Sequence, residues 1–251
     1  TDLEYGICHL GVIPLRKENS HKSEMITQLL YGDGYKIIEK RKDWNKIRLD
    51  WDGYEGWIDS NQIFKISKDN FDKITGAEIK ISTDLVNYIT TKDKSLFPVL
   101  IGSDLRALDL LEHHFEGELH QPKKLKKALA STAYLFLNAP YLWGGKTLIG
   151  IDCSGFTQMV YKINGIKLSR DAYQQALQGQ TLSFIEESEA GDLAFFDDAE
   201  GNIKHVGLLL ENHHIIHAHG TVRIDRIDQS GIFNLNKQTH THKLRFIKKM
   251  I

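Results

Sequence analysis

The chain has little cysteine. Cys8 and Cys153 are the two cysteines among its 251 residues, so a framework of several disulfides is excluded. Their surroundings in the sequence differ strongly, which argues against a bond between them. No apolar run approaches the roughly 20 residues that a membrane-spanning helix needs, so we expect a soluble chain without a membrane span.

An excess of charge of one sign is also missing. Thirty-two basic against 33 acidic side chains give a formal net charge of -1. A balance of this kind provides no electrostatic footprint for nucleic acid or for an anionic membrane surface, and we expect neither as a partner. A small, near-neutral substrate fits the composition better.

The beginning of the chain lacks a basic stretch followed by an apolar core, and its first residue is Thr1 rather than Met. By this pattern no signal peptide is present in this chain, and the start is compatible with the removal of one. The compartment stays open on this observation alone.

Residues 7–66 contain short β-type runs separated by glycine-rich turns. Ile47, Leu49 and Trp51 alternate with polar residues, as they would on one face of a strand. Several short strands with tight turns predict a small barrel. The sequence of residues 44–58 resembles a bacterial SH3-like domain. Its tryptophans are expected in the barrel core rather than on a ligand platform: Trp44, Trp51 and Trp57.

Residues 79–119 repeat this layout more weakly, and we interpret them as a second, degenerate copy. The pattern changes after Pro122, where residues 123–137 place apolar side chains at helical spacing behind a lysine-rich face. The expected buried positions of this helix are Leu125, Leu129, Thr132 and Phe136. The predicted domains are residues 1–70, 71–122 and 123–251.

A helix is predicted to begin at Cys153. Asp152 is a good N-cap, Phe156 and Met159 lie on one helical face, and Asn-Gly follows at residues 164–165 as a stop signal. Backbone N–H groups and the helix dipole at such a place stabilise a thiolate, the reactive form of cysteine. The charge of Asp152 opposes this effect, so we assign that residue to capping or substrate contact.

A thiolate nucleophile needs a base that takes up its proton and returns it. Residues 190–196 predict a turn followed by a buried strand, and residues 204–218 predict a β-hairpin. In an antiparallel pair the start of one strand lies beside the end of the other. His205 and His217 are therefore expected at the same end of the hairpin, where His205 can pair with Cys153 and His217 can orient His205.

Four blocks in this order resemble the NlpC-type cell-wall cysteine peptidases: Asp-Cys-Ser-Gly-Phe, Gly-Asp-Leu-Ala-Phe-Phe, His-Val-Gly and Ile-His-Ala. They cover roughly the last half of the chain, and separate blocks are more specific than a lone motif. The resemblance implies an α+β fold, with a papain-like cysteine peptidase core preceded by two small SH3-like β-barrels. With such barrels the chain is similar to the γ-D-glutamyl-L-diamino acid endopeptidases.

These enzymes cleave the γ-D-glutamyl bond to a diamino acid in peptidoglycan stem peptides, especially in fragments with a free N-terminal L-Ala. The resemblance therefore implies peptidoglycan-derived peptides as partners, no cofactor or metal, and the bacterial envelope rather than the cytoplasm. We also expect a monomer. The catalytic residues implied are Cys153, His205 and His217, and the substrate-binding positions implied are Tyr141, Trp143, Asp152, Ser154, Asp171 and, for the free amino group, Glu55.

Other interpretations compete with this one. An amidase or acyltransferase would use the same Cys-His-His site, and a non-catalytic wall-binding protein would keep only the fold.

Cys153 on its own resembles a buried structural thiol, as does Cys8, for which no base or motif is nearby. The histidines near His217 could suggest zinc, but their spacing is unspecific. Ser154 lacks the elbow motif of a serine nucleophile.

Overall fold

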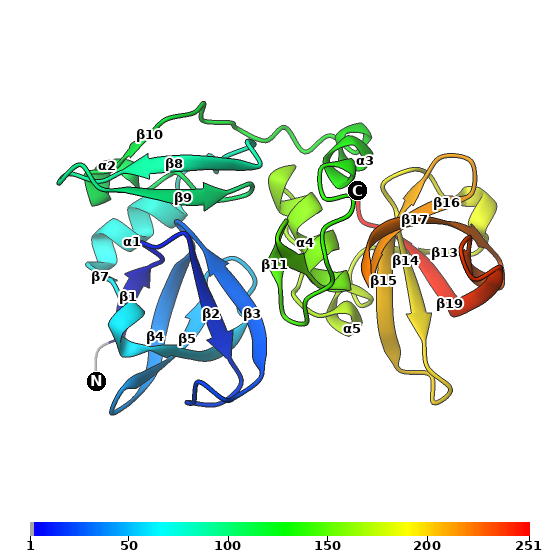
Figure 1. Cartoon of the computed structure of the whole chain (residues 1–251), viewed down its shortest axis with the longest axis horizontal. Helices are drawn as coiled ribbons and strands as arrows, with labels where there is room; N and C mark the ends of the chain where they lie inside the picture. The colour runs from blue at the N-terminus through cyan, green and yellow to red at the C-terminus, as the bar shows by residue number, and fades with distance from the viewer. Residues whose placement is uncertain (1–2) are drawn as a thin grey trace. The chain divides into compact units, whose positions relative to one another are not determined.

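The computed structural model describes residues 3–251, so the sequence observation on Thr1 lies outside the described residues. Its contacts divide the chain into two compact units, with the second spanning Lys124–Ile251 (Figure 1). Within the described part of the chain, no helix is long and apolar enough to cross a membrane. The domain boundaries predicted at residues 70 and 122 stay predictions.

The first unit is built on an antiparallel sheet whose strands curve around one core. In β5, Asn45, Ile47 and Leu49 are buried while the residues between them are more exposed, which is the alternation expected of a half-buried strand. The strand order is β3-β2-β6-β5-β4-β1-β7. The strands are β1 (Glu4–Ile7), β2 (Val12–Arg16), β3 (Met25–Leu30), β4 (Gly34–Arg41), β5 (Trp44–Leu49), β6 (Glu55–Asp59) and β7 (Lys65–Ile66).

Cys8 lies in this core with no exposed surface, and its thiol donates a hydrogen bond to the carbonyl of Leu10. Its interpretation as a structural thiol is therefore confirmed, and both cysteines are free of disulfides. Of the tryptophans expected in the core, Trp57 is buried, whereas Trp44 and Trp51 are half-buried. A short 3-10 helix (Ser60–Gln62) and helix α1 (Lys68–Thr75) follow the strands.

The region interpreted as a second barrel forms a three-stranded sheet in the order β10-β8-β9. Its core includes Tyr31 from the first region, so the two regions share buried contacts. Gly32 shows how closely they approach, because a Cβ at this position, which has φ of +85°, would lie 1.8 Å from the carbonyl oxygen of Asp104. The elements are β8 (Val86–Thr90), β9 (Leu96–Leu100), α2 (Leu108–Leu111) and β10 (His114–Phe115).

The second unit begins with helix α3, which spans Lys127–Tyr134 and is shorter than predicted. Lys124 has φ of +53°, a left-handed conformation that a right-handed helix does not contain. The prediction that the helix begins after Pro122 and buries Leu125 is therefore wrong, since Leu125 is exposed. The other predicted positions, Leu129, Thr132 and Phe136, are buried as expected.

Helix α4 spans Cys153–Ile163, where the sequence predicted it. The Asp152 side chain accepts a hydrogen bond of 2.7 Å from the backbone N–H of Gly155 and so caps the helix. All 11 residues of α4 are buried, although the sequence predicted only one buried face. The helix is covered because it packs between α3 and the strands β15 (Ile203–Leu210) and β16 (His214–His219).

The sheet of the second unit has the order β13-β19-β14-β15-β16-β17-β18, and a further pairing of β18 with β19 closes it on itself. Helices α3, α4 and α5 gather on one side of these strands (Figure 1). The predicted hairpin is confirmed by the pairing of Leu208 with Ile216 in β15 and β16. The remaining elements are β11 (Lys146–Thr147), β12 (Gly150–Ile151), α5 (Ala172–Gln175), β13 (Gln180–Leu182), a 3-10 helix (Ile185–Glu187), β14 (Leu193–Asp197), β17 (Thr221–Asp228), β18 (Gly231–Asn234) and β19 (Thr239–Lys249).

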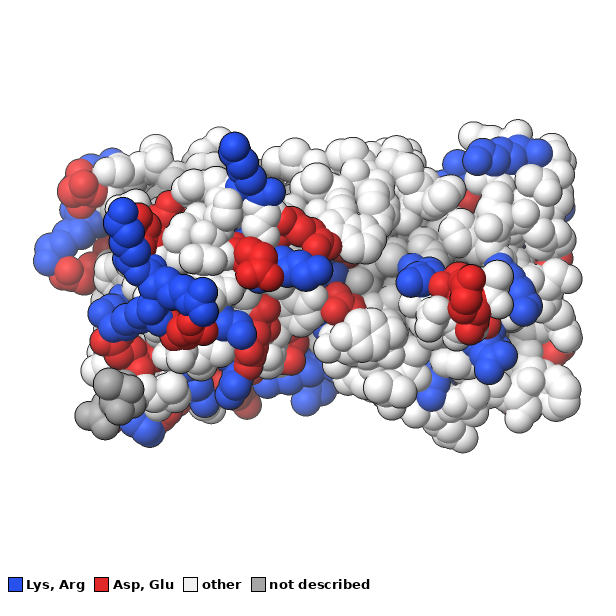
Figure 2. Space-filling model, turned by 90° about the horizontal axis from the view of Figure 1, so that it is seen from below, with Lys and Arg blue, Asp and Glu red and all other residues white. Residues whose placement is uncertain are grey.

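Charges of both signs are interspersed on the face drawn in Figure 2, and no broad patch of one sign is visible there. This distribution agrees with the near-neutral composition. It gives this face no field that would attract a polyanion.

Candidate active site

Cys153 is the first residue of α4 and retains 8% of its surface, in contrast to the fully buried Cys8. Burial and the charge of Asp152 raise the pKa of the Cys153 thiol to about 12, against the lowering influence of the Val206 backbone N–H and of Arg170. The expectation that the helix start yields a thiolate is thus outweighed by desolvation. Desolvation therefore favours the neutral thiol in the resting state.

The Val206 N–H acts directly on the sulfur, and Val206 directly follows His205 in β15. The nucleophile therefore lies beside the strand that carries the predicted base. Cys153 and His205 are 52 positions apart in the sequence, and they come together because α4 packs directly on β15.

His205 and His217 meet as predicted. The Nε2 atom of His205 lies 2.8 Å from the Nδ1 atom of His217, and the ring planes are at 82°. Both rings are buried, at 6% and 0% exposure. Because Nε2 of His205 is engaged in this contact, Nδ1 is the nitrogen that remains for proton exchange with a thiol.

Asp225 extends this pair and was missed in the sequence. Its Oδ2 atom lies 2.9 Å from Nε2 of His217, while Arg223 donates two hydrogen bonds to the carboxylate and the Leu235 N–H a third. Burial alone would raise the pKa of Asp225, but the hydrogen bonds from His217 and Arg223 outweigh it and hold the pKa well below its usual range. Asp225 is therefore an ionised acceptor.

This acceptor fixes the protons of both imidazoles. An ionised carboxylate only accepts, so His217 donates from Nε2 and its Nδ1 atom carries the lone pair. His205 must then donate from Nε2 to His217, and its own Nδ1 atom carries the lone pair of a general base. The three residues form one directed chain of hydrogen bonds, from His205 through His217 to Asp225.

Two further histidines surround the base. The ring of His242 in β19 stacks on that of His205, with ring centroids 4.3 Å apart and an interplanar angle of 28°. The ring centroid of His219 lies 6.4 Å from that of His205. Burial first, and then His217, His242 and His219, lower the pKa of His205 well below its ordinary value. Burial likewise lowers the pKa of His242 to about 4. The base is therefore neutral at neutral pH.

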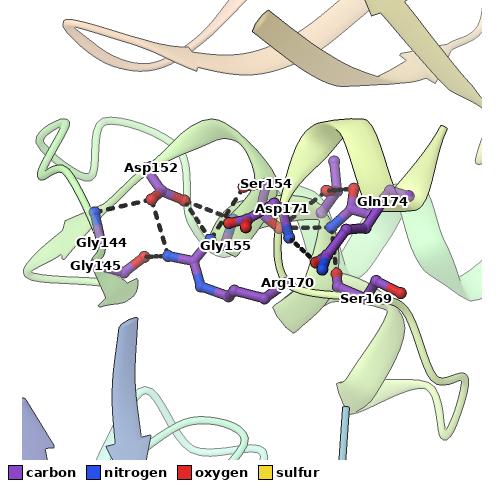
Figure 3. A network of polar contacts seen from close by, with 11 residues as sticks. Gly144, Gly145, Asp152, Ser154, Gly155, Ser169, Arg170, Asp171 and Gln174 are labelled. Carbon is purple, nitrogen blue, oxygen red and sulfur yellow. Dashed lines mark hydrogen bonds and ion pairs between the residues drawn. The ribbon is translucent and has the colours of Figure 1, made fainter. Parts of the chain in front are cut away.

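Asp152 and Ser154 are held by Arg170, a buried side chain for which no role was predicted (Figure 3). Its guanidinium contacts the two carboxylate oxygens of Asp152 at 2.9 and 2.8 Å and donates to Ser154 Oγ at 3.0 Å. The capping role expected of Asp152 is confirmed by its bond from Gly155. Its substrate contact stays a prediction.

The other positions implied by the resemblance lie in different surroundings. Burial raises the pKa of Tyr141, and so does its interaction with Cys153, which places the phenol near the sulfur. Trp143 is 62% exposed. Asp171 caps α5 in a capping box with Gln174, whose side-chain oxygen accepts the Asp171 N–H at 3.1 Å. Their contacts with substrate stay predictions.

Glu55 belongs to the first unit, at the start of β6. Arg48 donates to it at 2.8 Å, and Lys46 forms an ion pair with it at 3.5 Å. The bond from Arg48, against the effect of burial, lowers the pKa of Glu55. The carboxylate is therefore ionised and partly neutralised by its own sheet, and its role toward an amino group stays a prediction.

The residues that sequence reasoning missed are Arg170, Asp225 and His242. Asp225 had a weak signal, because it stands in an alternating strand pattern where it points to the same side as Arg223. Arg170 precedes Asp171 in a block that was already singled out. His242 had no signal, since β19 begins 20 positions after the end of β16.

A thiol beside an oriented imidazole, at the start of a helix packed on an antiparallel sheet, defines the class of cysteine peptidases with a papain-like core. Residues 138–242 match the NlpC/P60 family, and residues 15–63 match the bacterial dipeptidyl-peptidase SH3 domain. The chain belongs to the NlpC/P60 family and is a cysteine peptidase with an N-terminal SH3-like region. The predicted fold class is thereby confirmed.

Relatives resemble the chain over most of its length. It is 30% identical to the gamma-D-glutamyl-L-lysine dipeptidyl-peptidase of Bacillus subtilis (strain 168), over 76% of this chain and 71% of the relative. For the enzyme of the same name from Bacillus cereus (strain ATCC 10987 / NRS 248), the values are 28%, 80% and 68%. A crystal structure of an NlpC/P60 family protein from Bacillus cereus ATCC 10987 shares the fold, with a TM-score of 0.78 at 19% identity, over 98% of this chain and 99% of that one.

Proposed function

We propose that this peptidase hydrolyses the γ-D-glutamyl to diamino acid bond of peptidoglycan stem peptides, in fragments with a free N-terminal L-Ala. Support for the substrate comes from relatives named gamma-D-glutamyl-L-lysine dipeptidyl-peptidase, which are similar over 76% and 80% of this chain. The observation that carries the chemistry is the hydrogen-bonded chain from His205 to Asp225 beside the sulfur of Cys153. A peptidoglycan substrate favours action in the bacterial envelope.

In the first half of the proposed reaction, Nδ1 of His205 takes the proton of the Cys153 thiol as the sulfur attacks the carbonyl carbon of the scissile bond. The imidazolium that forms is stabilised through His217 by the charge of Asp225. Donors for the developing oxyanion are the backbone N–H of Cys153 and the hydroxyl of Tyr141. The carbon–nitrogen bond then breaks, and His205 gives its proton to the leaving amine.

In the second half, a water molecule attacks the thioester while His205 accepts one of its protons. The carbon–sulfur bond breaks, the carboxyl product leaves, and the proton returns to the sulfur of Cys153. The base alternates between neutral and protonated states, which requires a resting neutral imidazole. Its lowered pKa meets this requirement.

The test is a digest of L-Ala-γ-D-Glu-L-Lys and of its N-acetylated form, analysed by mass spectrometry. We expect the wild type to release L-Ala-D-Glu from the free peptide and Cys153→Ala to release none. Cys8→Ala is the matched control, because this thiol is fully buried in the core of the first unit, and it should retain activity. Equal inactivity of wild type and Cys153→Ala would support a wall-binding protein, and transfer to an added amine without hydrolysis would support an acyltransferase.

A further inference from the structure

Asp152 creates an electrostatic problem at the proposed nucleophile. It caps α4 directly before Cys153, and its negative charge opposes the formation of a thiolate. The side chain of Asp152 is only 10% exposed, so water screens its charge little. A peptidase that needs a thiolate in its reaction must compensate this charge.

Arg170 lies where compensation is needed. It is 1% exposed, and its two terminal nitrogens contact one oxygen each of Asp152, at 2.9 and 2.8 Å. The same guanidinium lies 3.4 Å from the carbonyl of Gly145, and Asp152 accepts the Gly144 N–H at 2.8 Å. Figure 3 shows this network joining the turn at Gly144 and Gly145, the glycine turn, to the start of α4.

We propose that Arg170 is a positioning residue of the peptidase, which acts through Asp152: it neutralises the carboxylate beside Cys153 and fixes the glycine turn against the first turn of α4. The proposal rests on the proposed function for its catalytic meaning. The geometry suits this role because a planar guanidinium matches a carboxylate in two parallel bonds, which a lysine does not provide.

The contact with Ser154 adds a second consequence. Arg170 donates to its Oγ atom at 3.0 Å, so this oxygen acts as an acceptor there and its own O–H points elsewhere. The side chain of Gln175 connects α4 to the segment before Arg170, because it donates to the carbonyls of Ser154 and Ser169. Arg170 thus orients the residue that follows the nucleophile as well as the one that precedes it.

Other charged and titratable groups also face the sulfur. Tyr141 interacts with it from the segment before α4, and His205 is presented from β15 by the strand whose Val206 N–H acts on the sulfur. His217, His219 and His242 stand behind His205. The histidines are kept when Asp152 or Arg170 is replaced, whereas the pKa of Tyr141 depends on both of these charges. The double variant, which removes both charges together, separates the effect of the ion pair from that of the other groups.

The experiment measures the rate constant of Cys153 alkylation by iodoacetamide at pH 8, which needs no substrate and therefore does not depend on the proposed function. Asp152→Asn keeps a good N-cap but removes the negative charge that faces the guanidinium of Arg170. It should raise the rate about threefold to tenfold, because an altered neighbouring charge shifts a thiol pKa by about one unit or more and nucleophilicity offsets part of the gain. Arg170→Met should lower the rate by a similar factor.

The double variant Asp152→Asn/Arg170→Met should alkylate at about the wild-type rate, and Cys153→Ala provides the blank for Cys8. If the alkylation rate changes in the same direction in both single variants, the proposal is overturned, because a purely structural role predicts a lower rate in each. If Arg170→Met does not fold, as judged by circular dichroism, Asp152→Asn and the double variant still decide. Arg170→Lys should alkylate close to wild type yet hydrolyse peptide with a higher KM, since one amine cannot hold Asp152 and Ser154 together.

Discussion

The Nε2 atom of His217 lies 2.9 Å from Oδ2 of Asp225, and neither side chain is exposed. A buried carboxylate that is ionised can only accept, so this contact determines which nitrogen of His217 carries the proton. Through the 2.8 Å bond between the two imidazoles, it also determines which nitrogen of His205 is basic. Asp225 therefore sets the direction of proton transfer at His205 through His217, which contacts both residues.

Asp225→Asn should lower kcat/KM by about 10- to 100-fold, a loss typical of outer residues that orient a functional imidazole. The amide presents an N–H where the carboxylate accepted, which favours the wrong tautomer of His217 and removes the charge that stabilises the imidazolium. Steady-state kinetics with the tripeptide measure the effect. Asp228→Asn is the matched control, because this exposed acid on the same strand binds His240 instead. Equal losses in the two variants would contradict the role given to Asp225.

The pH dependence of kcat/KM should be flat through pH 6.5 and fall only at lower pH. Activity requires neutral His205, and burial together with the neighbouring histidines lowers its pKa well below the ordinary value of 6.5. Protonation of the base therefore occurs at a lower pH than for an exposed histidine. Initial rates between pH 4 and 8 at low substrate concentration provide the test. An acid limb centred at or above pH 6.5 would show that the base is solvated.

The sequence was sufficient for the elements that carry the triad. The N-cap at Asp152, the helix start at Cys153 and the hairpin around residues 211–213 are local features, determined by capping and by strand alternation. From these local features alone, the two imidazoles could be predicted to lie at the same end of the hairpin. The relation of β15 to α4 was inferred from the chemistry that a thiol requires.

The rest depends on contacts between distant segments. Arg170 and Asp152 are 18 residues apart, and His242 reaches His205 only because β19 pairs with β14, the strand next to β15. Local patterns do not encode such pairings. The helix expected from Pro122 failed for a related reason, because Lys124 is held by the carbonyl of Asn164 in a conformation outside the helical region.

Replacement of Phe156 by Ala should destabilise the second unit by about 3–5 kcal/mol. Phe156 in α4 is fully buried and forms an edge-to-face contact with Phe136, with ring centroids 6.0 Å apart. The loss combines lost burial with the cavity that remains. Urea unfolding followed by circular dichroism measures the change. Tyr134→Ala, at a position 48% exposed in α3, should change the free energy of unfolding by less than about 1 kcal/mol.

The stability of the second unit should decrease as the pH falls from 6.5 toward 4. The pKa of His242 is lowered from 6.5 to about 4 by burial and by the other histidines. In this window the unfolded chain binds a proton that the folded state does not, so stability is fully present above pH 6.5 and is lost as the pH falls through the folded-state pKa. Scanning calorimetry across this range should show a falling Tm. His242→Phe retains a ring over His205 but no longer titrates, so its Tm should fall less steeply; an equally steep fall would assign the effect to other groups.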